Sequence, residues 1–408
     1  MTKENVADST AAATARSDVT GTAAPSRHTN VGKASETHPQ EESHPKTVLL
    51  AVLVLVVVFL ALLACVVFGL TRPKHPKRTP STQRPHIIFI LADDLGWADV
   101  SYTGTPQIRT PNIDALAWNG VRLSRLYHQP VCTPTRSTIM SGLYPIHTGL
   151  QHFVIVNEEP RGLPLELKIL PEWLNEMGYT SYMVGKWHLG FCKASYTPTR
   201  RGFVTHMGNM GGAIDYFNHT RASAGYFGVD FWRNLTHAVE YHGVYYTDII
   251  TTEVKKIIKG HQPDKPMFLY VAHYATHYSS NDDRLETPDH YTKGHEFIKN
   301  VNRTLYAGMV TALDYSVGEI ISSLDEAGIL NNSFIVFASD NGAPATFWDA
   351  RAASPWPLRG EKDTLFEGGV RVPGIVWAPK SLRQRMGSEY MPLFHASDWL
   401  PTLYELAG

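Results

Sequence analysis

The chain has 408 residues, with 37 basic and 38 acidic side chains and 43% hydrophobic content. That length can bury a large core and allows one large domain or two smaller ones. The near-zero net charge argues against a nucleic-acid partner, because such proteins usually carry a basic stripe. A small local cluster of cations would still be enough to bind an anionic substrate. The three cysteines (Cys65, Cys132 and Cys192) are too few for a disulfide framework.

The first 85 residues divide into three segments that precede the globular part. Residues 1–47 contain no Trp, Tyr or Phe, so we expect a disordered tail. Residues 48–70 carry no charge and are long enough for one transmembrane helix, which would anchor the protein to a membrane. A cleaved signal peptide is the alternative, although the stretch is long and lies far from the N-terminus. Residues 71–85 are rich in Pro, Lys and Arg, which predicts an extended stalk.

Two signals disagree about which side of the membrane the C-terminal part occupies. Basic residues are more frequent after the apolar stretch than before it, which favours the cytosol. Four glycosylation sequons favour the lumen or the exterior, and all of them follow the stretch: Asn218, Asn234, Asn302 and Asn331. We expect a single-pass membrane protein of the secretory pathway with a lumenal or extracellular catalytic part, because the site chemistry below favours that side.

From residue 86 to residue 408 the sequence predicts a single α/β body. Short apolar runs at 87–92, 268–272 and 334–338 are continuous, as expected of strands buried on both faces. Helical patterns, for example at 165–177 and 305–327, lie between them. This alternation predicts a large, mostly parallel mixed sheet flanked by helices.

Polar residues follow these three runs and a fourth apolar run, Tyr182-Met183-Val184, and form four groups: Asp93-Asp94, Lys186-Trp187-His188, His277, and Asp340-Asn341. Ligands of open α/β sheets bind beyond the carboxyl ends of the strands, so these groups are candidates for one shared site. For any single aspartate, a helix cap or a turn is the alternative. Lys186 and His188 would point the same way in an extended segment. Three carboxylates with the Asn341 amide oxygen favour Ca²⁺ or Mg²⁺ over zinc, and a flexible charged cage favours calcium.

The segment Cys132-Thr-Pro-Thr-Arg136 predicts an anion site at the start of a helix. Thr133 suits the N-cap and Pro134 the first helical position, and the helix would end at Gly142. Cys132 would then lie where the helix dipole and free N–H groups favour an anion, with Arg136 as a bidentate donor. A small buried cysteine before a capped helix is the alternative.

At this point the residues resemble a known family. The segment Cys132-x-Pro-x-Arg136 with Ser-Thr-Ile-Met-Ser-Gly-Leu-Tyr after it, and the segment Gly185-Lys-Trp-His-Leu-Gly190, resemble the two signatures of the sulfatases. The resemblance extends from about His86 to the last residue. It looks strongest to the branch of arylsulfatase B (N-acetylgalactosamine-4-sulfatase), as in Ala92-Asp-Asp-Leu-Gly-Trp97 and Glu367-Gly-Gly-Val-Arg371.

The resemblance implies sulfate ester hydrolysis at a calcium ion, on an aryl sulfate or a sulfated carbohydrate such as N-acetylgalactosamine-4-sulfate of glycosaminoglycans. It implies that the formylglycine-generating enzyme of the endoplasmic reticulum converts Cys132 to formylglycine, which attacks sulfur and touches the metal. Arg136 and Lys186 would steady this nucleophile, and His188 would hold or deprotonate one of its hydroxyls. His277 and Lys362 would bind the sulfate. The implied calcium ligands are Asp93, Asp94, Asp340 and Asn341.

The sequence departs from the family in three ways. The last segment leads, in the family, into a smaller C-terminal domain that we expect to be missing here. Cys192 has no plausible disulfide partner, and the residues after His277 differ from the branch's Pro-containing stretch. Two rival functions follow: a phosphatase or phosphodiesterase of related architecture, and an inactive membrane-bound pseudo-sulfatase that binds glycans.

Overall fold

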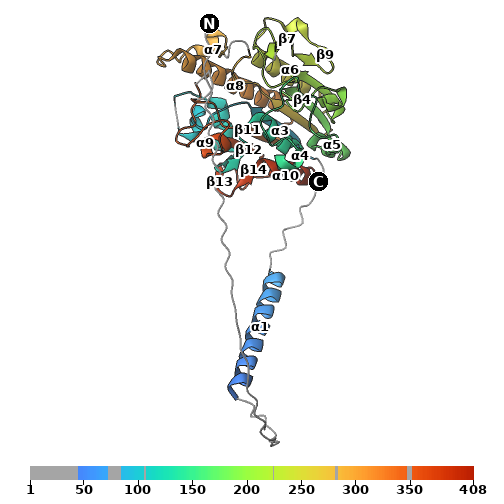
Figure 1. Ribbon diagram of the computed structural model, residues 1–408, viewed down its shortest axis with the longest axis vertical. Helices are drawn as coiled ribbons and strands as arrows, with labels where there is room; N and C mark the ends of the chain where they lie inside the picture. The colour runs from blue at the N-terminus through green and yellow to red at the C-terminus, as the bar shows by residue number, and fades with distance from the viewer. Residues whose placement is uncertain (1–44, 72–83, 105–106, 224, 281–283, 347–351) are drawn as a thin grey trace, which may run out of the picture. The chain divides into compact units, whose positions relative to one another are not determined.

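The computed structural model describes residues 45–71, 84–104, 107–223, 225–280, 284–346 and 352–408 (Figure 1). The side chains of 45–48, 51 and 65–71 are not part of that description. Most of the predicted tail, residues 1–44, and of the predicted stalk, residues 72–83, lies outside the described residues. The chain divides into two units, Met1–Lys77 and Arg78–Gly408.

The first unit contains helix α1, which covers Pro45–Thr71. A helix is therefore present where the sequence predicts one over 48–70, and its described side chains are exposed. In the described part of the chain, however, no helix reaches the length and apolarity needed to cross a bilayer. The predicted transmembrane anchor is therefore not supported.

The second unit is built on a ten-stranded sheet in which five adjacent strands run parallel, and four of these lie at its centre. Hydrogen bonding aligns Ala92 with Ser339 and Ala272 with Gly185, so these strands end at nearly the same level. Their order in the sheet is β11 (Ser333–Ser339), β1 (His86–Ala92), β10 (Met267–Ala272) and β4 (Thr180–Gly185). The structure confirms the large mixed sheet and the three strands that the sequence predicts.

Shorter strands extend the sheet on both sides and form two small pairs. Beyond β4 come β5 (Thr205–Gly208), β8 (Trp232–Arg233) and β9 (Thr236–His237). Beyond β11 come the antiparallel β12 (Gly374–Trp377), then β2 (Val121–Leu123) and β13 (Ser388–Tyr390). The small pairs are β3 (Leu126–Tyr127) with β14 (Phe394–His395), and β6 (Thr220–Ser223) with β7 (Tyr226–Val229).

Helices cover both faces of the sheet (Figure 1). Side chains of β1 alternate between two apolar clusters: Ile88 and Ile90 face one, and Ile87 and Phe89 face the other. This explains the continuous apolar runs, because each strand is buried on both sides. The first cluster includes α2 (Pro111–Asn119), α6 (Tyr246–Gly260) and α8 (Val301–Glu326), and the second includes α3 (Cys132–Ser141), α5 (Leu170–Glu176) and α10 (Trp399–Ala407). The shorter helices are α4 (Pro145–Thr148), α7 (Asp289–Thr292) and α9 (Glu367–Val370).

The predicted helix at 165–177 is shorter than expected, since α5 begins only at Leu170. Pro171 occupies the first turn, where its missing N–H costs nothing. The Glu172 carboxylate accepts a hydrogen bond from the backbone N–H of Ile169 at 2.8 Å, which caps the helix at this point. The predicted helix at 305–327 lies within α8 except for its last residue, and α8 begins earlier because Asn300 caps it.

Glycine is required at position 185, where β4 ends and the active-site segment begins. Its φ is +106°, and a Cβ built there would overlap the carbonyl oxygen of Ala272 on β10. The same carbonyl accepts the backbone N–H of Lys186 at 2.8 Å. The close approach of the two strands therefore sets the position of Lys186.

We predict that Gly185→Ala destabilises the fold more than Gly243→Ala, measured by urea unfolding. Gly243 also has a positive φ, +86°, but a Cβ there meets no atom within 4 Å. Backbone strain of roughly 1–3 kcal/mol is common to both variants, and only the first adds a clash between strands. Equal losses of unfolding free energy would contradict the role given to strand packing.

Candidate active site

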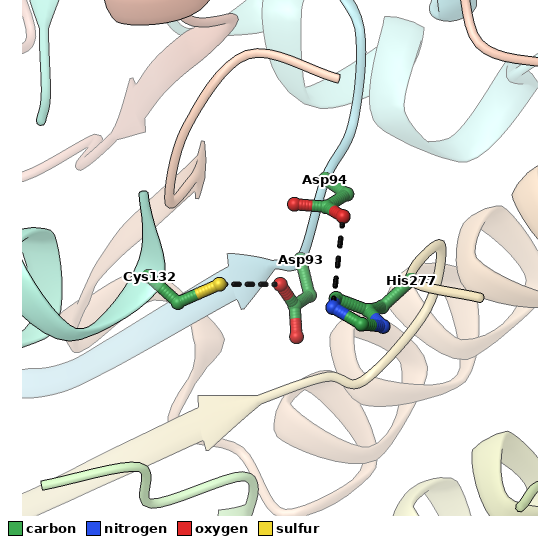
Figure 2. Close-up of side chains that lie close together, drawn as sticks. All are labelled: Asp93, Asp94, Cys132 and His277. Atoms are coloured by element: carbon green, nitrogen blue, oxygen red, sulfur yellow. Dashed lines mark hydrogen bonds and ion pairs between the residues drawn. The ribbon is translucent and has the colours of Figure 1, made fainter. Parts of the chain in front are cut away.

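The polar groups that follow the four central strands meet at one edge of the sheet, as the sequence predicts. Asp93 and Asp94 follow β1, Asp340 and Asn341 follow β11, and the other two groups follow β4 and β10. Figure 2 shows the side chains of Asp93, Asp94, Cys132 and His277 directed toward a common space. Their potential ligand atoms all lie within 4.8 Å of one another, and all four residues are buried.

Cys132 is the first residue of α3, and its sulfur lies inside this group. The Sγ atom is 3.5 Å from Oδ1 of Asp93 and 3.5 Å from Nζ of Lys186. The helix ends at Gly142 with φ +70°, as predicted. The predicted N-cap is wrong: Thr133 lies within the helix, and its hydroxyl donates to the carbonyl oxygen of His188 instead. That bond joins α3 to the segment that follows β4.

Three cations neutralise the three carboxylates, one for each. Lys186 Nζ donates to Asp93 Oδ2 at 2.5 Å, and Lys362 Nζ donates to Asp94 Oδ2 at 2.6 Å. Arg136 donates to Asp340 Oδ2 through Nε at 3.1 Å and Nη2 at 2.8 Å. The attraction within a buried ion pair offsets the cost of removing both charges from water only when the pair has short, well-aligned hydrogen bonds, as these pairs do. The predicted catalytic cations thus all contact the predicted metal ligands.

The second oxygen of each carboxylate contacts an uncharged group instead of a cation. Asp93 Oδ1 lies near the Cys132 sulfur, and Asp94 Oδ1 accepts from Nδ2 of Asn341 at 2.7 Å. Among the described residues, Asp340 Oδ1 accepts the backbone N–H of Asp94 alone, at 3.3 Å. These oxygens form an acidic set that faces no further charged donor among the contacts of the described residues.

The pKa values of these groups reflect burial and the neighbouring charges. Burial and repulsion from Asp340 raise the pKa of Asp93 to about 7. Burial also acts to raise the pKa of Asp340, but attraction to Arg136, Lys186 and Lys362 outweighs it and the pKa falls below its usual value. The Cys132 thiol has a pKa well above its usual value because of burial and of the charges of Asp340 and Asp93. An unmodified thiol here is therefore neutral and a poor nucleophile.

The residues fit a hard divalent cation. Oδ1 of Asn341 is buried and has no hydrogen-bond partner among the described residues. Leaving a buried amide oxygen without a partner costs about 1–3 kcal/mol, so a ligand is expected there. An amide oxygen with three carboxylates is the donor set that calcium prefers.

The two histidines of the site are both neutral. Nδ1 of His277 lies 2.8 Å from the carbonyl oxygen of Tyr278 and so carries the proton, while Nε2 lies 3.7 Å from Asp94 Oδ2. Burial and the charges of Lys362 and Lys186 lower the pKa of His277 well below its usual value. His277, which the sequence predicts to bind the sulfate, therefore lies beside Asp94, a predicted metal ligand.

His188 is held differently from the sequence expectation. Its φ is +57°, so the segment 186–188 is not extended, and the prediction that His188 and Lys186 point the same way loses its basis. Nε2 lies 3.0 Å from the carbonyl oxygen of Ile155 and so donates its proton there. Nδ1 is buried and has no partner in the described part of the chain. Burial and the charges of Lys186 and Arg136 lower the pKa of His188 well below its usual value.

The sulfatase family model matches residues 85–408, which is most of the chain. The chain belongs to the sulfatase family. Mouse arylsulfatase J is 44% identical over 331 residues, which cover 81% of this chain and 53% of that protein. Dog N-acetylgalactosamine-6-sulfatase is 32% identical, and the match covers 73% of this chain and 58% of that protein. This sulfatase chain therefore spans little more than half the length of these curated relatives.

Solved structures agree with this assignment. Ps i-CgsB, in complex with k-i-k-neocarrahexaose, is 33% identical with a TM-score of 0.72, covering 80% of this chain and 72% of that one. PsFucS1 sulfatase from Pseudoalteromonas sp. is 26% identical with a TM-score of 0.64, covering 80% of this chain and 68% of that one. The phosphonate monoester hydrolase of Agrobacterium radiobacter is 17% identical with a TM-score of 0.53. The match covers 80% of this chain and 74% of that one, and it shows a shared fold alone.

Several supporting residues of the sulfatase site carry no motif signal in the sequence. The hydroxyls of Thr276 and Tyr306 lie 3.1 Å and 3.2 Å from the carbonyl oxygen of Asp94 and hold its backbone in place. The Tyr274 hydroxyl lies 3.0 Å from Nδ1 of His277. The contacts of Thr276 and Tyr306 with Asp94 join residues 182 and 212 positions apart, so only the folded arrangement identifies them.

The predicted glycosylation sites differ in accessibility. Asn218, Asn302 and Asn331 are exposed, as a glycan requires. Asn234 is half-buried, and its Oδ1 accepts the backbone N–H of His206 at 2.9 Å. Glycosylation at all four stays a prediction. Cys192 is exposed and is a free cysteine.

We predict that calcium raises the melting temperature of the wild-type protein and that Asn341→Ala reduces this shift. A ligand that binds only the folded state at about 100 times its Kd stabilises that state by about 2.7 kcal/mol. Differential scanning calorimetry with and without calcium measures the effect. Asp314→Asn is the matched control, because Asp314 is a buried carboxylate that binds the first turn of α2 instead. A calcium-induced rise in melting temperature that persists in Asn341→Ala but is lost in Asp314→Asn would contradict a calcium site at Asn341.

Proposed function

We propose that this chain hydrolyses sulfate esters with a formylglycine derived from Cys132 and one calcium ion held by Asp93, Asp94, Asp340 and Asn341. The observation that carries the proposal is the buried set of paired carboxylates and cations around Cys132, at the first residue of a helix. When present, the ion and the formylglycine supply charge neutralisation and a hydroxyl nucleophile.

The charge balance of the site suits a sulfate ligand. Three carboxylates and three cations cancel, so a divalent cation would leave a net charge of about two positive units. That charge complements the dianionic sulfate released by hydrolysis. Because the site is buried, this complementarity acts at a low effective dielectric and is strong.

Each cation has a separate task in this proposal. Lys186 lies 3.5 Å from the side chain of residue 132 and would donate a hydrogen bond to the nucleophilic oxygen. Arg136 keeps Asp340 ionised and oriented through two hydrogen bonds. Lys362, on the side of Asp94, would stabilise the negative charge that develops on the ester oxygens.

The histidines would move protons. His188 has its lone pair at Nδ1, because Nε2 donates to Ile155, so it would accept a proton from the hydroxyl of residue 132. His277 is held by Tyr278 and Tyr274 with Nε2 toward Asp94, and it would contact the sulfate or the leaving oxygen after binding a second proton at Nε2.

The proposed substrate is a sulfated sugar. Support comes from the name of the relative N-acetylgalactosamine-6-sulfatase and from the k-i-k-neocarrahexaose in the complex of Ps i-CgsB. The sequence resemblance adds N-acetylgalactosamine-4-sulfate as a candidate for the sulfated unit. Conversion of Cys132 by the formylglycine-generating enzyme requires passage through the endoplasmic reticulum, so the proposed location is the lumen of the secretory pathway or the exterior.

The phosphatase reading has one observation in its favour, which is the shared fold of the phosphonate monoester hydrolase. It would need an unmodified nucleophile, whereas burial and the charges of Asp340 and Asp93 raise the pKa of the Cys132 thiol. It would also need ligands for a second metal, and the described residues gather one such group. The alternative of an inactive glycan-binding protein does not explain why all three predicted cations are present and paired with the predicted metal ligands.

Mass spectrometry of the tryptic peptide 126–136, from protein made in a secretory host, tests the proposal. We expect sulfur and two hydrogens of Cys132 to be replaced by one oxygen, which lowers the peptide mass and creates an aldehyde. Cys192 is the control, since it lies outside the motif and should stay a thiol. A fully intact thiol at Cys132 would favour either rival function.

We predict that Lys186→Ala lowers kcat for a small aryl sulfate about 10²–10³-fold, as for loss of one oxyanion donor. Lys186→Arg, which keeps the charge, should retain more activity. Circular dichroism and the melting temperature check that the variants fold. A loss below about tenfold in a folded Lys186→Ala protein would show that the lysine only supports the structure.

A further inference from the structure

Ser339 is the last residue of β11 and comes directly before the predicted metal ligands Asp340 and Asn341. The residue is fully buried. Its hydroxyl makes two hydrogen bonds with the backbone of the site. Oγ accepts the backbone N–H of Leu95 at 3.0 Å and donates to the carbonyl oxygen of Asn341 at 2.8 Å. One hydroxyl therefore joins the segment that follows β1 to the segment that follows β11.

These two bonds lie just beyond the point where the regular pairing of the strands ends. The parallel register of β1 and β11 runs as far as Ala92 opposite Ser339, and the backbone N–H of Asp340 donates to the carbonyl oxygen of Ala92 at 2.9 Å. Beyond that bond, side chains join the two segments. A hydroxyl is suited to this task because it donates and accepts at the same time.

The N–H that Ser339 accepts belongs to the peptide group after Asp94, whose φ is +62°. This left-handed conformation is uncommon for a residue with a side chain, and it persists only where the surroundings hold it. The carbonyl oxygen of the same peptide group accepts from the hydroxyls of Thr276 at 3.1 Å and Tyr306 at 3.2 Å. Both ends of this peptide group are therefore bound, and Ser339 holds the N–H end.

Ser339 is itself held by its backbone. Its carbonyl oxygen accepts the Nδ1–H of His128 at 2.6 Å, and its N–H donates to the carbonyl oxygen of Pro373 at 3.4 Å. Nε2 of His128 in turn accepts the Nε1–H of Trp399 at 3.2 Å. The position of the Ser339 hydroxyl is therefore set by the packing of the fold.

The two segments that this hydroxyl joins carry all four proposed calcium ligands, Asp93 and Asp94 on one and Asp340 and Asn341 on the other. Oxygen ligands bind calcium at about 2.3–2.6 Å, so the spacing of the two pairs decides whether both can bind one ion. Groups that hold metal ligands from behind typically lower metal affinity about 10–100-fold when they are removed.

We propose that Ser339 is a positioning residue for the calcium ion, an inference that rests on the proposed function. Its hydroxyl sets the spacing between the two pairs of ligands and holds the left-handed backbone that presents the Asp94 carboxylate. Without the hydroxyl, the N–H of Leu95 and the carbonyl oxygen of Asn341 lose these bonds and the two segments can move apart. Calcium affinity then falls, although Ser339 acts only through other residues.

Calorimetric titration of the chelator-treated protein with calcium tests this role. We expect Ser339→Ala to raise the Kd for calcium about tenfold or more. Ser333→Ala is the matched control, because Ser333 begins the same strand, is buried, and donates its hydroxyl to the carbonyl oxygen of Ile329 at 2.9 Å. Ser333 lies at the other end of β11, about 20 Å away, so its loss should change the Kd less than about twofold.

Two further readouts separate positioning from a general loss of stability. In the calcium-free protein, the amide hydrogen of Leu95 should exchange faster in Ser339→Ala than in the wild type, because it loses its acceptor. Its exchange should be unchanged in Ser333→Ala. At calcium concentrations far above the Kd, Ser339→Ala should recover most of the wild-type kcat for a small aryl sulfate, which a damaged fold would not.

A wild-type Kd for calcium in Ser339→Ala, or an equal rise in Ser333→Ala, would overturn the inference. If Ser339→Ala does not fold, Ser339→Thr and Ser339→Val repeat the test, because they have nearly the same shape and Thr alone keeps the hydroxyl. We expect Ser339→Thr to bind calcium more tightly than Ser339→Val, and equal Kd values would overturn the inference.

The wild-type protein separates this inference from the proposed function. A wild-type protein that binds no calcium would contradict the proposed function and this inference with it. A wild-type protein that binds calcium but hydrolyses no sulfate ester would contradict the proposed function alone. The comparison of Kd values for Ser339→Ala and Ser333→Ala then still decides the role of Ser339.

Discussion

Three carboxylates buried side by side are the constraint on which the rest of this protein depends. Asp93, Asp94 and Asp340 repel one another, and burial removes the water that would screen them. One cation for each, supplied by a different part of the chain, makes the arrangement tolerable. Burial and repulsion from Asp340 still raise the pKa of Asp93, and a divalent cation among these oxygens would oppose that rise.

The parallel sheet is what brings these groups together. Four adjacent strands end at the same edge, so residues from positions 93 to 341 need no long loops to meet. The close approach of β4 and β10 at Gly185 fixes Lys186, and α3 presents Cys132 to the same space. Catalytic precision therefore rests on strand packing, and positions such as Gly185 affect the chemistry without touching a substrate.

Much of this was predictable from residue patterns, and the exceptions have physical causes. Continuous apolar runs followed by Asp, Asn, Lys or His predicted the strands and the shared site. The left-handed backbone at His188 and the hydroxyl of Thr133 depend on tertiary hydrogen bonds, which local patterns do not contain. Thr276 and Tyr306 contact the carbonyl oxygen of Asp94 from segments far apart in the chain, so no spacing in the sequence predicts these contacts.

The most direct test of the central claim is a crystal structure of protein from a secretory host, grown with calcium and measured for anomalous scattering. We expect one ion with oxygen ligands from Asp93, Asp94, Asp340 and Asn341 at about 2.3–2.6 Å. We also expect oxygen, in place of sulfur, on the side chain of residue 132. An intact thiol with no ion among these oxygens would contradict the account.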